Sequence, residues 1–317
     1  MSMQTRHGFW REALALHGTS IPQVAPLVAV MGLLATGIVA VARLWERQFQ
    51  TEINLDLTPF ELAGAALGIL LVFRTNAGYE RWWEARKLWG GFVDRSRNFV
   101  IDALAYGPSD AQWRNRLVRL AAAYPHVVKH TLRSEPLAPA VTAHVGQDMT
   151  DQINAAGHRP SFVAFQLANL LREACERWGM DRFAFLQIDR ERALLIDNFG
   201  GCERILNTPV PKAYSTKIRH FLLLFLLSLP LTLLHRLHSD WLIPVISMLV
   251  AYPLLSLDLL GVELENPFAA DNLSHLPLDG LTATIERNVM ELLQRTPTRL
   301  PTGRFAQEDD STGSAHT

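Results

Sequence analysis

The stretch ELAGAALGILLVFRTNAGYERWWEARKLWGGF, residues 61–92, begins apolar and ends crowded with tryptophan, arginine and lysine. Its first part, residues 61–73, carries a single formal charge, at Glu61. Tryptophan gathers at membrane–water interfaces, and lysine and arginine gather on the cytoplasmic side. The stretch therefore predicts a helix that leaves a membrane near residue 74.

No proline lies between residues 60 and 107, so we expect one helix to continue from the membrane into the cytosol. On this helix Trp82, Arg86 and Trp89 follow the i, i+4, i+7 spacing that brings side chains onto one face. Together with Trp83 they are predicted to form an interfacial anchor, in which arginine can stack on tryptophan. The plainer alternative is an anchor with no further role.

The apolar block at residues 59–73 is short for a span that faces lipid. At about 1.5 Å per residue it covers roughly 22 Å, whereas the hydrocarbon core of a bilayer is about 30 Å thick. It opens with Thr58-Pro59-Phe60-Glu61, which has the pattern of a capping box. Gly64 and Gly68 form a pair of small residues that lets helices approach closely. These features favour a helix surrounded by protein rather than by lipid.

Three further apolar blocks raise the predicted number of membrane helices to four. Hydrophobic residues make up 49% of the 317-residue chain and charged residues only 19%, against about 25% charged in typical soluble domains. Residues 21–42 carry no formal charge and are long enough to span a bilayer. Residues 221–234 and 241–257 are separated by a short polar loop and are predicted to form a transmembrane hairpin.

Other classes of function find little support in the sequence. The net charge of −1 gives no electrostatic reason to expect a nucleic-acid partner. Cys175 and Cys202 lie far apart, which argues against a disulfide framework or a zinc site. His126 and His130 lack the glutamate of a zinc-protease motif, so packing or a surface role is favoured over metal binding. With no catalytic or nucleotide-binding fingerprint present, we expect neither an enzyme nor a cofactor.

The positive-inside rule sets the predicted orientation. Six lysines and arginines fall within residues 74–97, whereas the loop at residues 43–57 is slightly acidic, so the first segment is placed in the cytoplasm and the second outside. Both termini are then cytoplasmic. The predicted segments are a cytosolic N-terminal segment (1–20), transmembrane helix 1 (21–42), an outer loop (43–57), transmembrane helix 2 (58–74), a cytosolic helical region (75–211), the transmembrane hairpin (212–258), a second cytosolic helical region (259–296) and a disordered tail (297–317).

Four motifs resemble the bacterial branch of the bestrophin family. They are FRTNAGYERWWEARKLWG (73–90), GGCERILNTPVPKAY (200–214), ELENPF (263–268) and TIERN (284–288), in the order and spacing of the family. The resemblance covers most of the chain except its ends. It implies an all-α membrane protein with four transmembrane helices and a large cytosolic helical bundle. It further implies a homopentamer in the bacterial inner membrane that acts as a passive channel for monovalent ions.

The resemblance also implies which residues line the pore. In the family the second transmembrane helix forms a narrow neck, whose positions correspond here to Ala65, Ile69 and Phe73. A second, cytosolic constriction corresponds to Phe183. Considered without the family, Ile69 and Phe73 are more simply read as residues that pack against the first apolar block. Many relatives carry a larger residue than Ala65 at its position, so the neck is expected to be narrow at two layers instead of three.

Ion selectivity and gating are less well defined by the resemblance. Eukaryotic members favour chloride, whereas bacterial members look more permeable to cations, and the acidic outer loop adds a weak reason to expect cations. Eukaryotic members bind calcium through an acidic run after NPF, but residues 269–272 read Ala-Ala-Asp-Asn here, so calcium gating is not expected. The alternative function is a membrane-anchored helical scaffold or regulator that conducts no ions.

Overall fold

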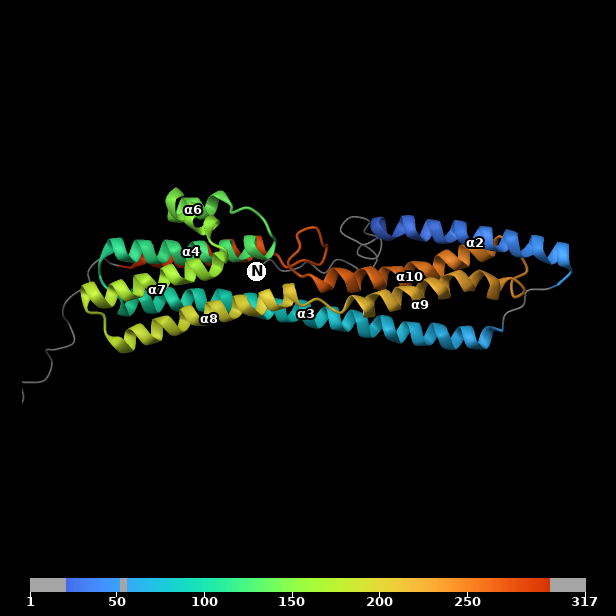
Figure 1. The fold of residues 1–317 in the computed structure, drawn as a ribbon, viewed down its shortest axis with the longest axis horizontal. Helices are drawn as coiled ribbons and strands as arrows, with labels where there is room; N and C mark the ends of the chain where they lie inside the picture. The colour runs from blue at the N-terminus through green and yellow to red at the C-terminus, as the bar shows by residue number, and fades with distance from the viewer. Residues whose placement is uncertain (1–20, 52–55, 297–317) are drawn as a thin grey trace, which may run out of the picture. The chain divides into compact units, whose positions relative to one another are not determined.

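Helices make up almost all of the described part of the chain, residues 21–51 and 56–296 of the computed structural model (Figure 1). No strand occurs in these residues, so the all-α prediction is confirmed. The predicted N-terminal segment and tail lie outside them. The helices are α2 (Ile21–Phe49), α3 (Leu57–Tyr106), α4 (Ala111–Leu132), α5 (Pro139–Val145), α6 (Gln147–Ala155), α7 (Arg159–Trp178), α8 (Arg182–Asn207), α9 (Lys212–Leu233), α10 (Leu242–Glu265) and α11 (Leu278–Arg295).

Four of these helices are long and apolar enough to cross a membrane: α2, α3, α9 and α10. They contain the four spans predicted from the sequence. Pro230 and Pro253 lie inside α9 and α10, as expected for prolines that membrane helices tolerate. The helices α2 and α10 extend past the predicted spans at residues 42 and 258, because charged side chains end an apolar span without ending a helix.

Helix α3 is a single helix of 50 residues, as the absence of proline predicted. Its start differs from the prediction. The Asp56 side chain accepts a hydrogen bond from the Thr58 backbone N–H at 3.2 Å, and Glu61 is exposed. Asp56 therefore caps the helix, and the predicted capping box of Thr58 and Glu61 is wrong. An aspartate directly before the first helical residue is as good an acceptor for these N–H groups as a serine or threonine.

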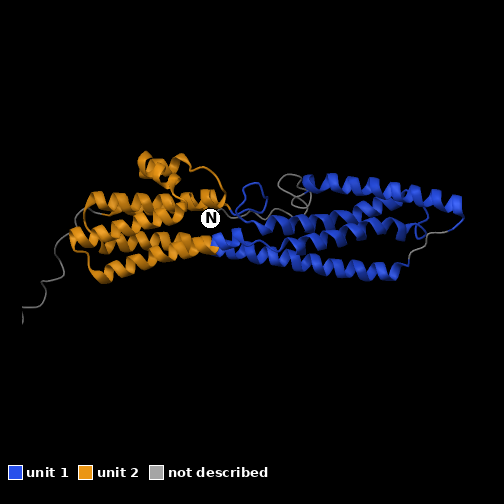
Figure 2. Ribbon diagram, in the orientation of Figure 1, with its two compact units in different colours: residues 1–87, 202–276 blue, residues 88–201, 277–317 orange. Residues whose placement is uncertain are grey.

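The chain forms two compact units (Figure 2). Unit 1 is Met1–Lys87 with Cys202–Leu276, and unit 2 is Leu88–Gly201 with Pro277–Thr317. Helices α3 and α8 each contribute one part to unit 1 and the other part to unit 2.

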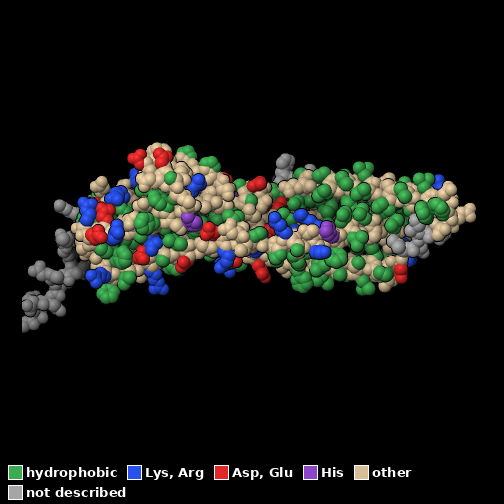
Figure 3. Space-filling model, in the orientation of Figure 1, with side chains coloured by type: hydrophobic (Ala, Val, Ile, Leu, Met, Phe, Trp, Pro, Cys, Tyr) green, Lys and Arg blue, Asp and Glu red, His purple; other side chains and the backbone are tan. Residues whose placement is uncertain are grey.

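In unit 1, α2 packs along α10 and α9, and α3 joins them through its apolar face. The buried cluster consists of Met31, Leu67, Leu71, Ile218, Leu222, Leu226 and Ala251. The outer faces of the same helices are apolar as well: Leu33 and Leu249 are 74% and 72% exposed, and apolar side chains cover much of the visible face of unit 1 (Figure 3). An apolar surface of this extent needs a nonaqueous neighbour, so unit 1 is the part of the chain that meets the bilayer.

In unit 2, α4 is the central helix and contacts α5, α7 and α11. Asp110 caps α4 by accepting the Trp113 N–H at 2.7 Å. The Trp113 ring is fully buried, and its Nε1–H donates to the Leu170 carbonyl of α7 at 2.8 Å. This bond matters because a buried indole N–H without an acceptor is destabilising. The aromatic core of unit 2 thus fixes α4 against α7.

Candidate functional site

The first part of α3 has one buried face and one uncovered face. Leu67 and Leu71 are 3% and 0% exposed and belong to the core of unit 1. Ile69 and Phe73, two of the predicted neck residues, are 57% and 60% exposed, and Ala65 is exposed as well. Their spacing of four residues puts all three on one face. This chain therefore leaves an apolar stripe of α3 without a protein partner.

The two glycines of the predicted small-residue pair differ in their surroundings. A Cβ at Gly64 would lie 3.1 Å from the Phe225 ring of α9, so this glycine does permit a close helix contact. A Cβ at Gly68 would meet nothing within 4 Å. Only Gly64 has a packing role within one chain. The expectation that protein surrounds this helix is not met by a single chain, because half or more of the surface of Ile69 and Phe73 is open.

Directly after Phe73, unit 1 contains a group of four charged side chains, of which Arg74 and Asp258 are largely buried. The Arg74 guanidinium is 2% exposed and donates to the Asp258 carboxylate of α10. Asp258 also accepts from Arg219 Nε at 3.0 Å, and Glu265 lies 3.6 Å from Arg74. A Cβ at Gly261 would lie 3.3 Å from Arg74 Nε, so the glycine makes room for the guanidinium. Compensated in this way, Arg74 presents little positive charge beside the apolar stripe.

Arg81 joins three of the sequence motifs in unit 1. Its guanidinium donates to the carbonyls of Ile205, of Thr208 at 2.8 Å and of Glu265 at 3.3 Å. The first carbonyl belongs to the last turn of α8, the second to the residue that follows α8, and the third to the last residue of α10. Because the last carbonyls of a helix have no partner within it, an arginine placed there satisfies them. The motifs thus have a structural role that sequence reasoning missed.

Trp82 and Trp83 remain candidates for the interfacial anchor. Trp82 is half-buried and donates from Nε1 to the Ser274 carbonyl at 2.8 Å. Trp83 is 47% exposed, and its ring centroid lies 6.5 Å from that of Trp82. Arg86 is half-buried.

Trp89 does not belong to this anchor. Its side chain is fully buried in unit 2, where its ring centroid lies 5.1 Å from that of Phe92. The predicted placement of Trp89 at a membrane interface is therefore wrong. The helical spacing was read correctly, but this part of α3 packs into the core of unit 2, which the spacing alone does not reveal.

Phe183 lies in the first turn of α8 and is 82% exposed. The Asp181 side chain accepts the backbone N–H groups of Phe183 and Ala184 at 2.8 and 3.1 Å, which fixes the start of the helix. Leu186, one turn further, is 62% exposed. The helix therefore starts with two uncovered apolar side chains, a surface suited to a second copy of the chain or to a pore lining.

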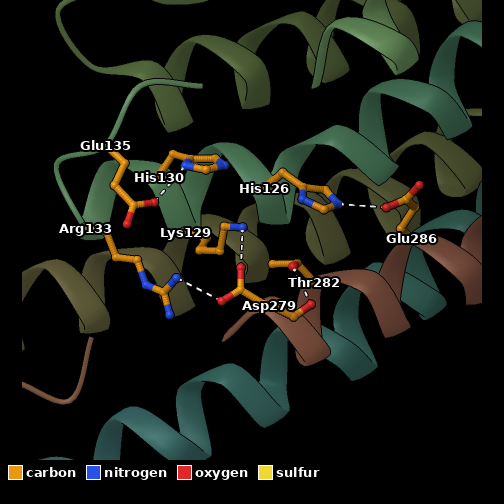
Figure 4. Close-up of polar contacts among 8 residues, drawn as sticks. All are labelled: His126, Lys129, His130, Arg133, Glu135, Asp279, Thr282 and Glu286. Atoms are coloured by element: carbon orange, nitrogen blue, oxygen red, sulfur yellow. Dashed lines mark hydrogen bonds and ion pairs between the residues drawn. The ribbon is translucent and has the colours of Figure 1, made fainter. Parts of the chain in front are cut away.

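In unit 2, the glutamate of the TIERN motif contacts two histidines, of which Figure 4 shows His126. The Glu286 carboxylate of α11 lies 2.9 Å from His126 Nε2 of α4 and 2.9 Å from His144 Nε2 of α5. Burial lowers the pKa of His126 below its ordinary value. Burial acts to raise the pKa of Glu286, but hydrogen bonds to His144 and His126 outweigh it and the pKa lies below its usual range. The motif therefore fixes α11 against α4 and α5.

A second ion-pair group lies beside the first one (Figure 4). Asp279 at the start of α11 accepts from Lys129 at 2.8 Å and from Arg133 at 3.0 Å. The hydrogen bond from Lys129, helped by that from Arg133, lowers the pKa of Asp279 to about 2. His130 contacts Glu135 at 3.1 Å. The histidine pair singled out in the sequence is thus engaged with carboxylates, and no metal-binding group of three ligands occurs in residues 21–51 and 56–296.

The loop after ELENPF is closed by an amide. Asn272 Nδ2 donates to the carbonyls of Glu263 at 3.1 Å and Asn266 at 3.0 Å. The two bonds fold the loop back onto the end of α10. Asp271 beside it is exposed.

The four apolar helices of unit 1, together with the charged helical unit 2, define an all-α membrane protein. The model of the family described as "Bacterial/Fungal Bestrophin protein" matches residues 1–291. The chain therefore belongs to the bestrophin family, in its bacterial and fungal branch.

Individual relatives agree with this assignment. The chain is 32% identical over 308 residues to a voltage-dependent anion channel-forming protein of Mesorhizobium japonicum, covering 96% of each chain. It is 31% identical over 290 residues to a protein of the same description from Ralstonia nicotianae, covering 90% of this chain and 93% of the relative. The crystal structure of a bacterial bestrophin homolog from Klebsiella pneumoniae superposes with a TM-score of 0.77 at 29% identity, covering 86% of this chain and all of the other.

Proposed function

We propose that the protein is the subunit of a homopentameric ion channel in the bacterial inner membrane. The observation that carries this proposal is the uncovered apolar stripe of α3, Ala65, Ile69 and Phe73, in a chain related to channel-forming proteins. The apolar part of α3 is short and uncovered in one chain, and it gains protein neighbours when copies of the chain surround an axis. Cyclic symmetry then places the same stripe of every copy toward that axis.

Ile69 and Phe73 are proposed to form the narrow neck of the pore. Apolar side chains offer an ion no replacement for its hydration shell, so such a constriction gates by expelling water. The third position, Ala65, has the smallest side chain, and the neck is proposed to be wider there. Phe183, with its 82% exposed ring, is proposed to form a second constriction at the start of α8.

The proposed ions are monovalent anions, in keeping with the descriptions of the relatives. The cation preference that the sequence suggested came from the bacterial members that the chain resembles and, more weakly, from the acidic outer loop. In unit 1, Arg43 contacts Glu46 at 2.9 Å and Asp240 at 2.8 Å. These pairs leave the net charge of the region unchanged, so the choice of anions rests on the descriptions of the relatives.

The proposed orientation places both termini and unit 2 in the cytoplasm. It rests on the lysines and arginines that follow the apolar part of α3 and on the positive-inside rule. Trp82 and Trp83 would then lie at the cytoplasmic interface, where tryptophan is enriched.

Ion flux from purified protein in liposomes tests the proposal. A channel of this kind gives single-channel currents, and the reversal potential in a chloride gradient follows the chloride equilibrium potential. A reversal potential that follows potassium would overturn the anion assignment while keeping the channel. The complete absence of flux from a correctly assembled, inserted pentamer would favour the membrane-anchored scaffold instead.

A further inference from the structure

Unit 2 contains a cavity that the proposed pore does not use. It has a volume of about 180 Å³ and lies between α4, α5, α6 and α7. Arg116 and Arg119 of α4, His144 of α5 and Gln166 of α7 supply its polar wall. Among the described residues that line it, none is acidic. The cavity is thus lined in part by hydrogen-bond donors and positive charge.

Arg119 carries a charge that no carboxylate compensates in the described residues. Its Nε donates to Asn115 Oδ1 at 2.7 Å, and its Nη1 makes a long contact of 3.4 Å with the Ala143 carbonyl. Arg116, by contrast, is paired with Glu173 at 3.2 Å. A guanidinium offers five N–H donors in a fork that matches a carboxylate. Arg119 therefore retains donors and a full charge for an anion in the cavity.

The remaining wall of the cavity is apolar. Leu120 of α4, Met149 of α6 and Leu170 of α7 line it. An inorganic anion leaves such a wall without a partner, whereas a short hydrocarbon chain covers it and removes its own apolar surface from water. The volume is below the roughly 300–1,000 Å³ of pockets for drug-sized ligands. The cavity suits a small molecule with a charged end and a short apolar body.

We propose that this cavity is a binding site for a small organic carboxylate, held by Arg119 at its charged end and by Leu120, Met149 and Leu170 along its body. The proposal concerns binding only and does not depend on ion conduction.

Ligand binding has a structural consequence for α5 and α6. These two short helices are joined at Gly146, whose φ of +82° lies in the region that favours glycine. A carboxylate in the cavity contacts α4 and α7 as well as the α5–α6 pair, so it links the pair to the core of unit 2. Backbone amides of residues 139–155 are then expected to exchange more slowly when the site is occupied.

Equilibrium dialysis of the full-length protein in detergent tests the site, with pentanoate as the probe at fixed ionic strength. We expect saturable binding of pentanoate and at least tenfold weaker binding of its neutral amide, because hydrogen bonds between a guanidinium and a charged carboxylate are stronger than those to a neutral amide. Inorganic phosphate is expected to bind more weakly than pentanoate. If phosphate binds as tightly as pentanoate, the site is a general anion site and the proposed preference for an organic carboxylate is wrong. If the amide binds as tightly as pentanoate, the proposed role of Arg119 is wrong.

Two variants and one matched control complete the test. Arg119→Gln is expected to weaken pentanoate binding about tenfold, and Met149→Trp to abolish it by filling the cavity while leaving all charges in place. Arg172→Gln, which changes a 70% exposed arginine of α7 outside the cavity, is expected to bind like the parent. The site is contradicted if a folded Met149→Trp protein binds pentanoate as tightly as the parent and if pentanoate slows the exchange of residues 139–155 in it as much as in the parent. This outcome is decisive whether or not Arg119→Gln folds.

Discussion

Arg74 of α3 and Asp258 of α10 form an ion pair whose side chains are only 2% and 12% exposed. Arg219 and Glu265 extend it to a group of four charges within unit 1. Such a group contributes little net stability compared with apolar residues of the same volume, because both ions lose their hydration. Its effect is instead that neither partner can be removed alone without leaving a buried charge.

Asp258→Asn is therefore expected to destabilise the protein by about 3–5 kcal/mol, the usual cost of breaking a buried ion pair. Thermal unfolding in detergent measures the change. Asp271→Asn, which alters an exposed aspartate in the same unit, serves as the control and should melt like the parent. The double variant Arg74→Met, Asp258→Leu should recover most of the loss. A single variant that melts at the temperature of the parent would contradict the role assigned to this pair.

Phe73→Ala is expected to raise conductance or open probability, and Ala65→Ile to lower it. The barrier of an apolar constriction rises as its radius falls, and in the proposed pentamer each substitution would occur five times around the neck. Single-channel recording measures both effects. Leu33→Ala changes a 74% exposed apolar residue of α2 and should leave the current unchanged.

Assembly has to be checked in each of these neck variants, because Gly64 on the same helix packs against Phe225. If both neck variants form pentamers and conduct like the parent, the gate lies elsewhere. Phe183 is then the next residue to substitute.

Micromolar calcium is expected to leave the ion flux unchanged. Calcium typically takes six to eight oxygen ligands, and the loop after ELENPF is closed by the Asn272 amide, whose Nδ2 occupies the carbonyls of Glu263 and Asn266. Liposome flux with calcium and with chelator measures the effect. An increase in flux on adding calcium would contradict this prediction.

The contact between α11 and α4 is expected to weaken as the pH falls from 7.5 to 5.5. The pKa of His126 is below its usual value in the folded protein, so the unfolded form binds more protons in this range. Stability therefore decreases as the pH decreases. Hydrogen exchange of the α11 amides measures the loss of protection. His126→Gln should flatten the dependence, and protection in the parent that does not change with pH would rule the mechanism out.

The four long apolar helices were predictable because they follow from local properties. Uninterrupted apolar residues and the absence of proline are sufficient to predict the four spans and the 50-residue helix α3. The resemblance in the motifs led to the correct family, since four segments in a fixed order are far more specific than one. Both signals lie within short windows of sequence.

The environment of individual side chains was not predictable in the same way. Trp82 and Trp89 belong to one motif, yet one is half-buried in unit 1 and the other fully buried in unit 2. Arg74 directly follows the apolar block at residues 59–73, and Asp258 directly follows the block at residues 241–257, a signal that could have suggested their pairing. The cavity of unit 2 was not predicted, because it is formed between four helices. The spacing of residues along the sequence does not reveal how these helices pack against one another.

The bonds of Arg81 have a consequence for the order in which the protein is built. Its acceptors lie 124, 127 and 184 residues further along the chain. At a synthesis rate of about 5–20 residues per second, the last of them follows Arg81 by roughly 10–40 s. During that interval the guanidinium is hydrated while the apolar part of α3 is already available to the membrane. The apolar part of α3 is thus available for insertion before the hydrogen bonds of Arg81 hold α3 against the ends of α8 and α10. A chain that stops short of Glu265 leaves this arginine without its last acceptor.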